Sequence, residues 1–158
     1  MKFNRFCAAL VSAAALLVLQ PAQASLMTEV TDAGQTAATA QAVAANTTEI
    51  RGHLGGSDGA DIFGFNWAGG VFTADTFGSR AMNSIDTMLF VYNTAGTHFA
   101  FNDDWSGLDS FVSANLAAGS YYLAISQYSS NYNGPLTGFA DLSGYNANYV
   151  IHTSNIMA

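Results

Sequence analysis

The sequence predicts an all-β protein, an antiparallel β-sandwich, and two observations support this prediction. Beyond Ile50, hydrophobic and aromatic residues recur with a period of two, as expected for strands that bury one face. Short runs of Gly, Asn, Asp and Ser separate these segments at the spacing of a sandwich. No segment beyond Ile50 has a convincing helical period.

The first 24 residues have the features of a secretory signal peptide. Lys2 and Arg5 supply a basic start, residues 6–19 are almost entirely apolar, and a small-residue cleavage site follows at residues 22–24. A membrane anchor is the less favoured alternative, because a spanning helix needs about 20 apolar residues. We therefore expect cleavage after residue 24 and export to the periplasm or the extracellular medium.

Cleavage of this 24-residue signal from the 158-residue chain leaves 134 residues, enough for one domain. We expect an Ala-, Thr- and Gln-rich lead-in at residues 25–48, extended or with a short helical turn, and the sandwich at residues 49–158. All 11 acidic residues remain, with only two arginines, so the mature net charge is −9. This charge disfavours nucleic acid and anionic membranes as partners. Cys7 leaves with the signal, which excludes disulfides and thiol catalysis.

The clearest strands lie early in the sandwich domain. Phe63, Phe65 and Trp67 share one face of a strand, and residues 88–92 form a second strand that is apolar on both faces. Residues 93–96 are typical of a hairpin turn. Further strands are expected at residues 71–76, 97–101, 110–116, 121–128 and 149–153. Residues 129–148, between the last two of these strands, are expected to form a long loop.

Two carboxylates, Asp58 and Asp61, lie three residues apart in a Gly-rich loop that leads into the first aromatic strand. Few other charges occur in the chain, and acidic residues are rarely buried unless they are paired or bind a metal. Carboxylates at a flexible, Gly-rich strand entrance suggest a hard cation such as calcium, which prefers six to eight oxygen ligands.

Several segments together resemble the bacterial pre-peptidase C-terminal domain. The segments at residues 86–96, 102–104 and 116–125 occur in the order of that family. Upstream, Glu29-Val30-Thr31-Asp32 and residues 48–65 are similar to its entry motif and to its Asp-x-x-Asp segment. The resemblance covers nearly the whole mature chain, and it implies a jelly-roll-like β-sandwich that binds calcium.

The same resemblance implies the calcium ligands. It places Glu29, Asp32, Asp58 and Asp61 at the ligand motifs, while Thr31 stands where the family often has Asn. An ion held by these residues would join the lead-in to the sandwich. In the alternative interpretation, Asp58 and Asp61 are turn and edge residues and the other two belong to a disordered leader.

A second group, mostly acidic, lies on turns around the central hairpin and consists of Asp86, Asn102, Asp103, Asp104 and Asp109. These residues are candidates for a second cation site, or for acids that orient a polar ligand beside Trp105. The structural alternative is favoured here, because Asx residues at hairpin ends commonly cap their own turns, as expected for Asn93 and Asn102.

No catalytic set is apparent. The three histidines are isolated from one another in the sequence, and the pattern of a nucleophile elbow is absent. Paired carboxylates leave an unrecognised hydrolase as a remote alternative. We therefore expect a protein that is not an enzyme.

The aromatic residues divide into core and surface candidates. Seven large apolar residues lie in the predicted strands, and most of them should fill the core. They are Phe63, Phe65, Phe90, Phe99, Phe101, Tyr121 and Leu123. Trp105, Tyr128, Tyr132 and Tyr145 lie in or beside loops and are candidates for stacking on a ligand. We expect a calcium-binding module for an extracellular polysaccharide or fibrous protein. The alternative is a structural envelope or biofilm-matrix protein that self-associates.

Overall fold

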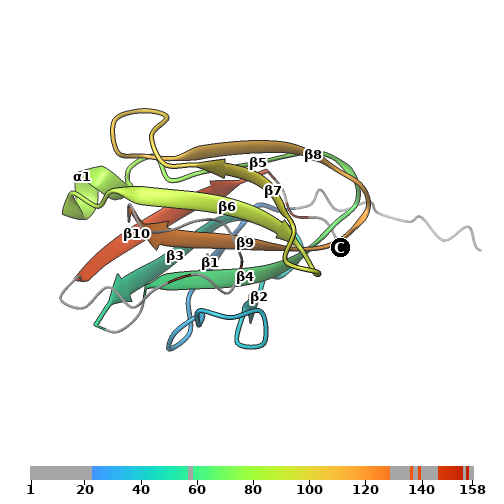
Figure 1. The fold of residues 1–158 in the computed structure, drawn as a ribbon, viewed down its shortest axis with the longest axis horizontal. Coiled ribbons are helices and arrows are strands. Elements are labelled where there is room, and N and C mark those ends of the chain that lie inside the picture. Colours follow the sequence, from blue (N-terminus) through green and yellow to red (C-terminus); the bar gives the residue numbers. More distant parts are fainter. Residues whose placement is uncertain are drawn as a thin grey trace, which may run out of the picture.

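Two five-stranded sheets pack face to face in the computed structural model of the chain (Figure 1). The structure describes residues 23–56, 59–128, 136, 139, 146–154 and 156. The predicted β-sandwich is therefore confirmed. Almost all of the signal segment, and most of the loop expected at residues 129–148, lie outside the described residues.

Each sheet takes strands from both halves of the chain. Sheet A has the order β1 (Ser25–Thr28), β3 (Thr47–Gly55), β10 (Asn146–Thr153), β5 (Gly70–Asp75) and β8 (Phe111–Leu116). Sheet B has the order β2 (Gln41–Ala42), β4 (Ala60–Trp67), β9 (Gly119–Gln127), β6 (Thr87–Asn93) and β7 (His98–Asn102). The five further strands predicted from the sequence are all present, with ends shifted by up to three residues.

The sheets are mixed instead of purely antiparallel. β1 pairs with β3 and β2 pairs with β4 in parallel, whereas the other pairings are antiparallel. Both parallel strands come from the stretch expected as a lead-in, and each forms one edge of a sheet. The chain leaves β1 in sheet A, crosses to β2 in sheet B, and returns to sheet A as β3. Parallel neighbours need such a crossover connection, whereas antiparallel neighbours can be joined by a tight hairpin.

The strand β6 is buried on both faces, as its sequence predicts. Leu89 and Val91 face the core between the sheets. Met88, Phe90 and Tyr92 face the opposite side, where they pack with a second apolar cluster that includes Leu136. The hairpin after β6 is also confirmed, because Gly96 has a φ of 80° and Asn93 Oδ1 accepts hydrogen bonds from two amides of the turn.

The core prediction is wrong for two residues. Phe63, Phe65 and Trp67 are buried between the sheets, but Phe99 and Phe101 are both exposed. These two residues lie on β7, which has a neighbouring strand on one side only. A register shift between Val91 and Tyr92 also leaves Phe99 opposite no residue of β6. These two side chains are exposed because β7 lies at the edge of its sheet, and the local sequence pattern does not reveal strand order.

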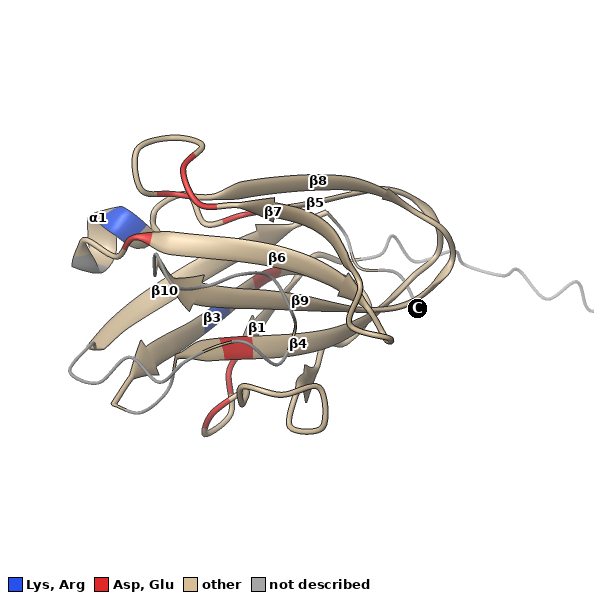
Figure 2. Cartoon of the chain, viewed as in Figure 1, with Lys and Arg blue, Asp and Glu red and all other residues tan. Residues whose placement is uncertain are grey.

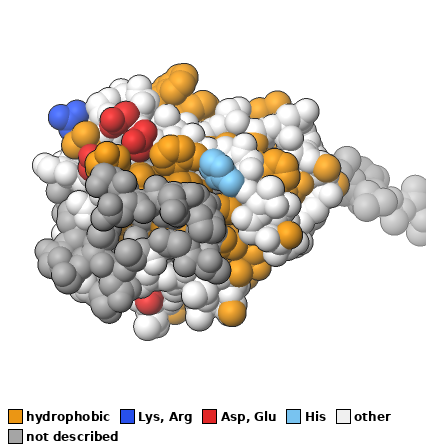
Figure 3. All heavy atoms as spheres, viewed as in Figure 1, with side chains coloured by type: hydrophobic (Ala, Val, Ile, Leu, Met, Phe, Trp, Pro, Cys, Tyr) orange, Lys and Arg blue, Asp and Glu red, His pale blue; other side chains and the backbone are white. Residues whose placement is uncertain are grey.

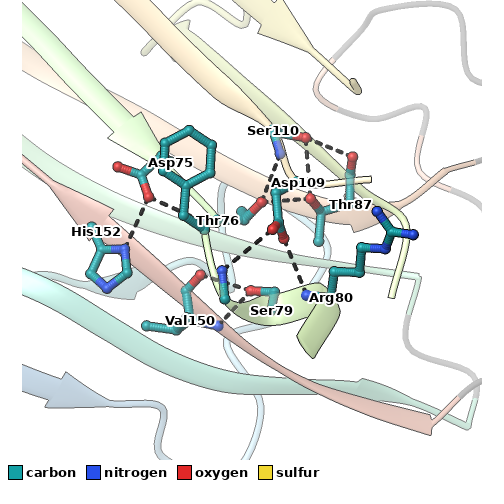
Figure 4. Close-up of polar contacts among 11 residues, drawn as sticks. Asp75, Thr76, Ser79, Arg80, Thr87, Asp109, Ser110, Val150 and His152 are labelled. Carbon is teal, nitrogen blue, oxygen red and sulfur yellow. Dashed lines mark hydrogen bonds and ion pairs between the residues drawn. The ribbon is translucent and has the colours of Figure 1, made fainter. Parts of the chain in front are cut away.

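A short helix, α1 (Ser79–Asn83), was not predicted, since five residues are too few to show a helical period. Its Ser79 hydroxyl donates to Val150 O and accepts from Val150 N, both at 2.9 Å, on the side of β10 where Val150 has no partner in β5 (Figure 4). The Asp109 carboxylate accepts hydrogen bonds from the amides of Gly78 and Arg80 at the start of the helix. Within the described residues, no helix is long and apolar enough to span a membrane.

Buried hydroxyl groups connect the sheets where the chain crosses from β7 to β8. The Thr87 hydroxyl lies within hydrogen-bonding distance of the hydroxyls of Thr76, at 2.6 Å, and of Ser110, at 3.2 Å (Figure 4). Thr76 Oγ1 also accepts from Ser110 N, and Ser110 Oγ donates to Thr87 O. Each of the three hydroxyl groups is therefore hydrogen-bonded.

Two phenylalanines that contact the same tyrosine test the assignment of core and edge. The rings of Phe65 and Phe99 each lie 5.9 Å from that of Tyr121, but Phe65 is 3% exposed and Phe99 is 49% exposed. Phe65→Ala should cost about 3–5 kcal/mol of unfolding free energy, as for a buried ring. Phe99→Ala should cost only about 1 kcal/mol. Urea unfolding measures both, and equal losses would contradict the assignment.

Candidate metal centre

Three carboxylates meet where the chain crosses from sheet A to sheet B. Glu29 and Asp32 lie on the crossover that follows β1, and Asp61 lies on β4. Each contributes an oxygen to a group whose members all lie within 4.8 Å of one another. Figure 2 shows acidic positions on β4 and on the crossover beside it. The cluster thus brings together three of the four carboxylates that the sequence singled out, and Asp58 lies outside the described residues.

Backbone amides hold the Glu29 carboxylate in place. Its Oε1 accepts a hydrogen bond from Ala33 N at 3.1 Å, and its Oε2 accepts one from His53 N at 2.8 Å. These donors come from the crossover and from β3 respectively. Because both oxygens are oriented by backbone, the carboxylate is positioned before any ion binds.

Asp61 is the buried member of the group, with 0% of its surface exposed. Alternation along β4 places it on the same side as Phe63, which faces the core between the sheets. Tyr149 of β10 donates its hydroxyl to Asp61 Oδ2 at 2.5 Å. This hydrogen bond joins sheet A to sheet B, and it orients the carboxylate toward the crossover.

Gly52 makes room for this arrangement. A Cβ atom at this position would overlap the Tyr149 hydroxyl and Glu29 Oε2. Tyr149 is the cross-strand partner of Gly52, so its ring lies over the bare backbone of β3. A glycine inside a strand commonly marks such a close approach, so Gly52 is the sequence signal for a contact that was not predicted for Tyr149.

The crossover itself is tightly turned. Thr31 has a φ of 68°, and Asp32 N donates to Val30 O at 2.9 Å across it. A threonine in the left-handed region is uncommon, and such strain is often found at binding sites. Asp32 Oδ1 then accepts from Gly34 N, and Gly34 O accepts from Ile62 N, next to Asp61. The turn is therefore tied to β4 beside the carboxylates.

The donor set suits a hard cation. The three clustered side chains offer only oxygen atoms as ligands. Asp32 is exposed, Glu29 is half-buried and Asp61 is buried. Calcium accepts such mixed carboxylate, carbonyl and water ligands, whereas zinc and softer metals select nitrogen and sulfur. The bare Gly52 backbone, which a side chain would fill, is consistent with a cradle for these oxygens.

The second acidic group has a different arrangement. Asp103 Oδ1 accepts a hydrogen bond from Asp104 N, as in a turn, and Asn102 Oδ1 accepts from Phe111 N at the start of β8. Asp86 Oδ1 is buried and has no hydrogen-bond partner among the described residues. Burial, followed by the nearby charges of Asp104 and Asp103, raises the pKa of the Asp86 carboxyl above 3.8.

The surface aromatics predicted from the sequence lie apart from the acidic cluster. Trp105 is 63% exposed, on the connection between β7 and β8, and its ring lies 5.1 Å from that of Phe111. Tyr128 is also exposed, just after β9. Tyr132 and Tyr145 lie outside the described residues. Trp105 is therefore available to contact a ligand.

Histidine contacts between distant strands were not predicted. His152 Nδ1 lies 2.9 Å from Asp75 Oδ1, between paired positions of β10 and β5 (Figure 4). His53 Nε2 lies 2.7 Å from Asn146 Oδ1. Among the described residues, neither ring is hydrogen-bonded to a hydroxyl group, so neither is paired with a serine or threonine nucleophile.

The fold is that of a pre-peptidase C-terminal domain. The structure is similar to the crystal structure of the pre-peptidase C-terminal domain of a collagenase from Bacillus anthracis, with a TM-score of 0.51 and 18% identity. The match covers 72% of this chain and 93% of that chain. No protein-family model matches the sequence, and no curated protein matches it. The resemblance in the sequence is therefore confirmed at the level of the fold.

Gly52→Ala should disturb the acidic cluster through sterics alone. The added methyl group must displace Tyr149 or Glu29, so we expect a loss of about 1–3 kcal/mol in unfolding free energy. Gly64→Ala is the matched control, because a Cβ atom there would meet Tyr122 at an ordinary 3.6 Å. Thermal unfolding compares the variants. Equal stability of the two would show that the close approach at Gly52 is unimportant.

Asp86→Asn should stabilise the protein at neutral pH. Because folding raises the pKa of Asp86, its ionised form destabilises the native state, and protonation relieves this cost as the pH falls. The gain from Asn should therefore be largest at about pH 7 and shrink as the pH approaches the ordinary carboxyl pKa of 3.8. Urea unfolding in chelator at several pH values measures this, and a gain independent of pH would contradict it.

Proposed function

We propose that this chain is an exported, calcium-binding β-sandwich module that binds an extracellular polymer, a polysaccharide or a fibrous protein, and catalyses no reaction. The observation that carries the proposal is the cluster of Glu29, Asp32 and Asp61 at the crossover between the sheets. The signal-like first 24 residues support export.

Calcium would act as a structural clamp in this proposal. Glu29 and Asp32 belong to the crossover, whereas Asp61 belongs to β4, so an ion bound by all three would connect the N-terminal edge strands to sheet B. The ion would also offset the mutual repulsion of three carboxylates. Removal of the ion would then loosen the crossover before it affects the hydrophobic core.

Calcium should raise the stability of the parent protein. At a calcium concentration 100 times the dissociation constant, binding adds about 2.7 kcal/mol to the unfolding free energy. Asp32→Asn should remove this gain, since Asn keeps an oxygen to accept from Gly34 N but lacks the charge. Asp104→Asn, on the connection from β7 to β8, is the matched control and should keep it. Thermal melting with calcium and with chelator makes the comparison.

Two outcomes would overturn the calcium proposal. A melting temperature of the parent that is unchanged by millimolar calcium would reject the metal site and leave the fold as described. An equal loss of the calcium response in Asp32→Asn and Asp104→Asn would assign the response to general screening of the acidic surface.

Polymer binding is supported by the exposed aromatic residues. Trp105 and Tyr128 present large apolar surfaces at loops, as residues that stack on sugars or peptides do. An array of glycans and matrix proteins should reveal a ligand whose binding falls at least tenfold in Trp105→Ala, about 1.4 kcal/mol. Leu26→Ala, an exposed apolar residue on β1, is the control. A ligand bound equally by both variants would reject this surface.

A further inference from the structure

An open groove runs between the edges of the two sheets, on the side opposite the acidic cluster. In the described part of the chain, β7 is the last strand of sheet B and β8 is the last strand of sheet A. The groove between them has a volume of about 630 Å³, and Phe99, Phe101, Trp105, Phe111 and Val112 line it. Both strands therefore turn the edge that has no neighbouring strand in the described residues toward one space, which these apolar side chains line together with His98, Asn102 and Ser113.

From this geometry we propose that the groove binds an extended, basic segment of another protein, which adds to the sheet edge as a strand. The inference rests on the proposed polymer-binding function and specifies the polymer as a protein chain. An added strand forms backbone hydrogen bonds with an exposed edge, and alternate side chains enter the adjoining pockets. The groove offers both features together, whereas a sugar polymer makes no use of a regular row of backbone donors and acceptors.

The edge strand β7 is suited to this pairing. Its five residues, His98–Asn102, all line the groove, so a bound strand would contact it along its full length. Phe99 is half exposed at the mouth of the core and contacts Tyr121, which gives an inward-pointing side chain of the partner an aromatic surface. Such exposed rings on an edge strand are costly in water and are stabilised when a partner covers them.

The charge of the groove favours a basic partner. Asp103 and Asp104 follow β7 directly, at the end of the groove where Trp105 lies, and neither forms an ion pair with a described residue. Figure 3 shows acidic side chains next to exposed hydrophobic ones on this part of the surface. A lysine or arginine of the partner would be attracted there. A second copy of this acidic chain, with a net charge of −7 before cleavage, would be repelled.

Peptides of defined chemistry test the proposal. The probe is a fluorescein-labelled peptide of alternating valine and threonine with two lysines at one end, and its anisotropy reports binding. One matched peptide carries glutamates in place of the lysines, and another carries N-methyl groups on alternate residues, which removes backbone donors. The proteins are the parent, Trp105→Ala, the double variant Asp103→Asn with Asp104→Asn, and Leu26→Ala as the control at the far edge of sheet A.

The parent and Leu26→Ala should bind the lysine peptide equally. Trp105→Ala should bind it about tenfold more weakly, and the N-methylated peptide should not bind. The double Asn variant should lose the preference for lysine over glutamate peptides, a preference that salt should also reduce in the parent. Amide resonances of residues 98–101 should shift on binding in nuclear magnetic resonance spectra of the parent.

Several results would overturn the proposal. No binding of the lysine peptide at about 1 mM, or equal binding of the N-methylated peptide, would reject strand addition. Shifts of residues 98–101 with cellohexaose but not with the peptide would assign the groove to sugars, and dimerisation through the groove would assign it to a second copy. Failure of the calcium proposal is distinguishable, because peptide binding would then persist while calcium leaves the melting temperature unchanged.

Discussion

The structure depends on a carboxylate held inside a hydrophobic sandwich. Asp61 has no exposed surface, yet it lies within reach of two further acids, Glu29 and Asp32. Removing ionised groups from water is costly unless hydrogen bonds and opposite charge compensate for it. Here a tyrosine from the opposite sheet and amides from two segments provide the hydrogen bonds. A bound cation would provide the opposite charge. The turn at Thr31 and the absence of a side chain at Gly52 both help to bring the carboxylates together around such an ion.

Two of the connections that cross between the sheets, β1 to β2 and β7 to β8, use different chemistry. At the β1 to β2 crossover, acidic side chains converge. At the β7 to β8 crossover, the hydroxyls of Thr76, Thr87 and Ser110 satisfy one another without charge. These hydroxyl contacts need no ion, and the groove between β7 and β8 lies beside them. The first connects the N-terminal edge strands to the core, and its stability is coupled to an ion in the function proposed above.

The sequence predicted those features that depend on local alternation, and it missed those that depend on strand order and long-range contact. The inward faces of β4 and β6 follow directly from a period of two. The exposure of Phe99 and Phe101 depends on the position of β7 at an edge, which no local pattern reveals. β2 has two residues and α1 has five, too few for any periodicity. Motif order singled out Glu29, Asp32 and Asp61, but Tyr149 joins them only through the pairing of β10 with β3.

Amide hydrogen exchange at the crossover tests the central claim most directly. The amides of Ala33 and His53 donate to the Glu29 carboxylate, so their protection reports whether the cluster is closed. With calcium, both amides should exchange slowly. With chelator they should exchange through local opening, together with β1, while the amide of the buried core residue Leu123 keeps its protection. Equal protection of Ala33 and His53 under the two conditions would contradict the claim that an ion clamps the two sheets at this crossover.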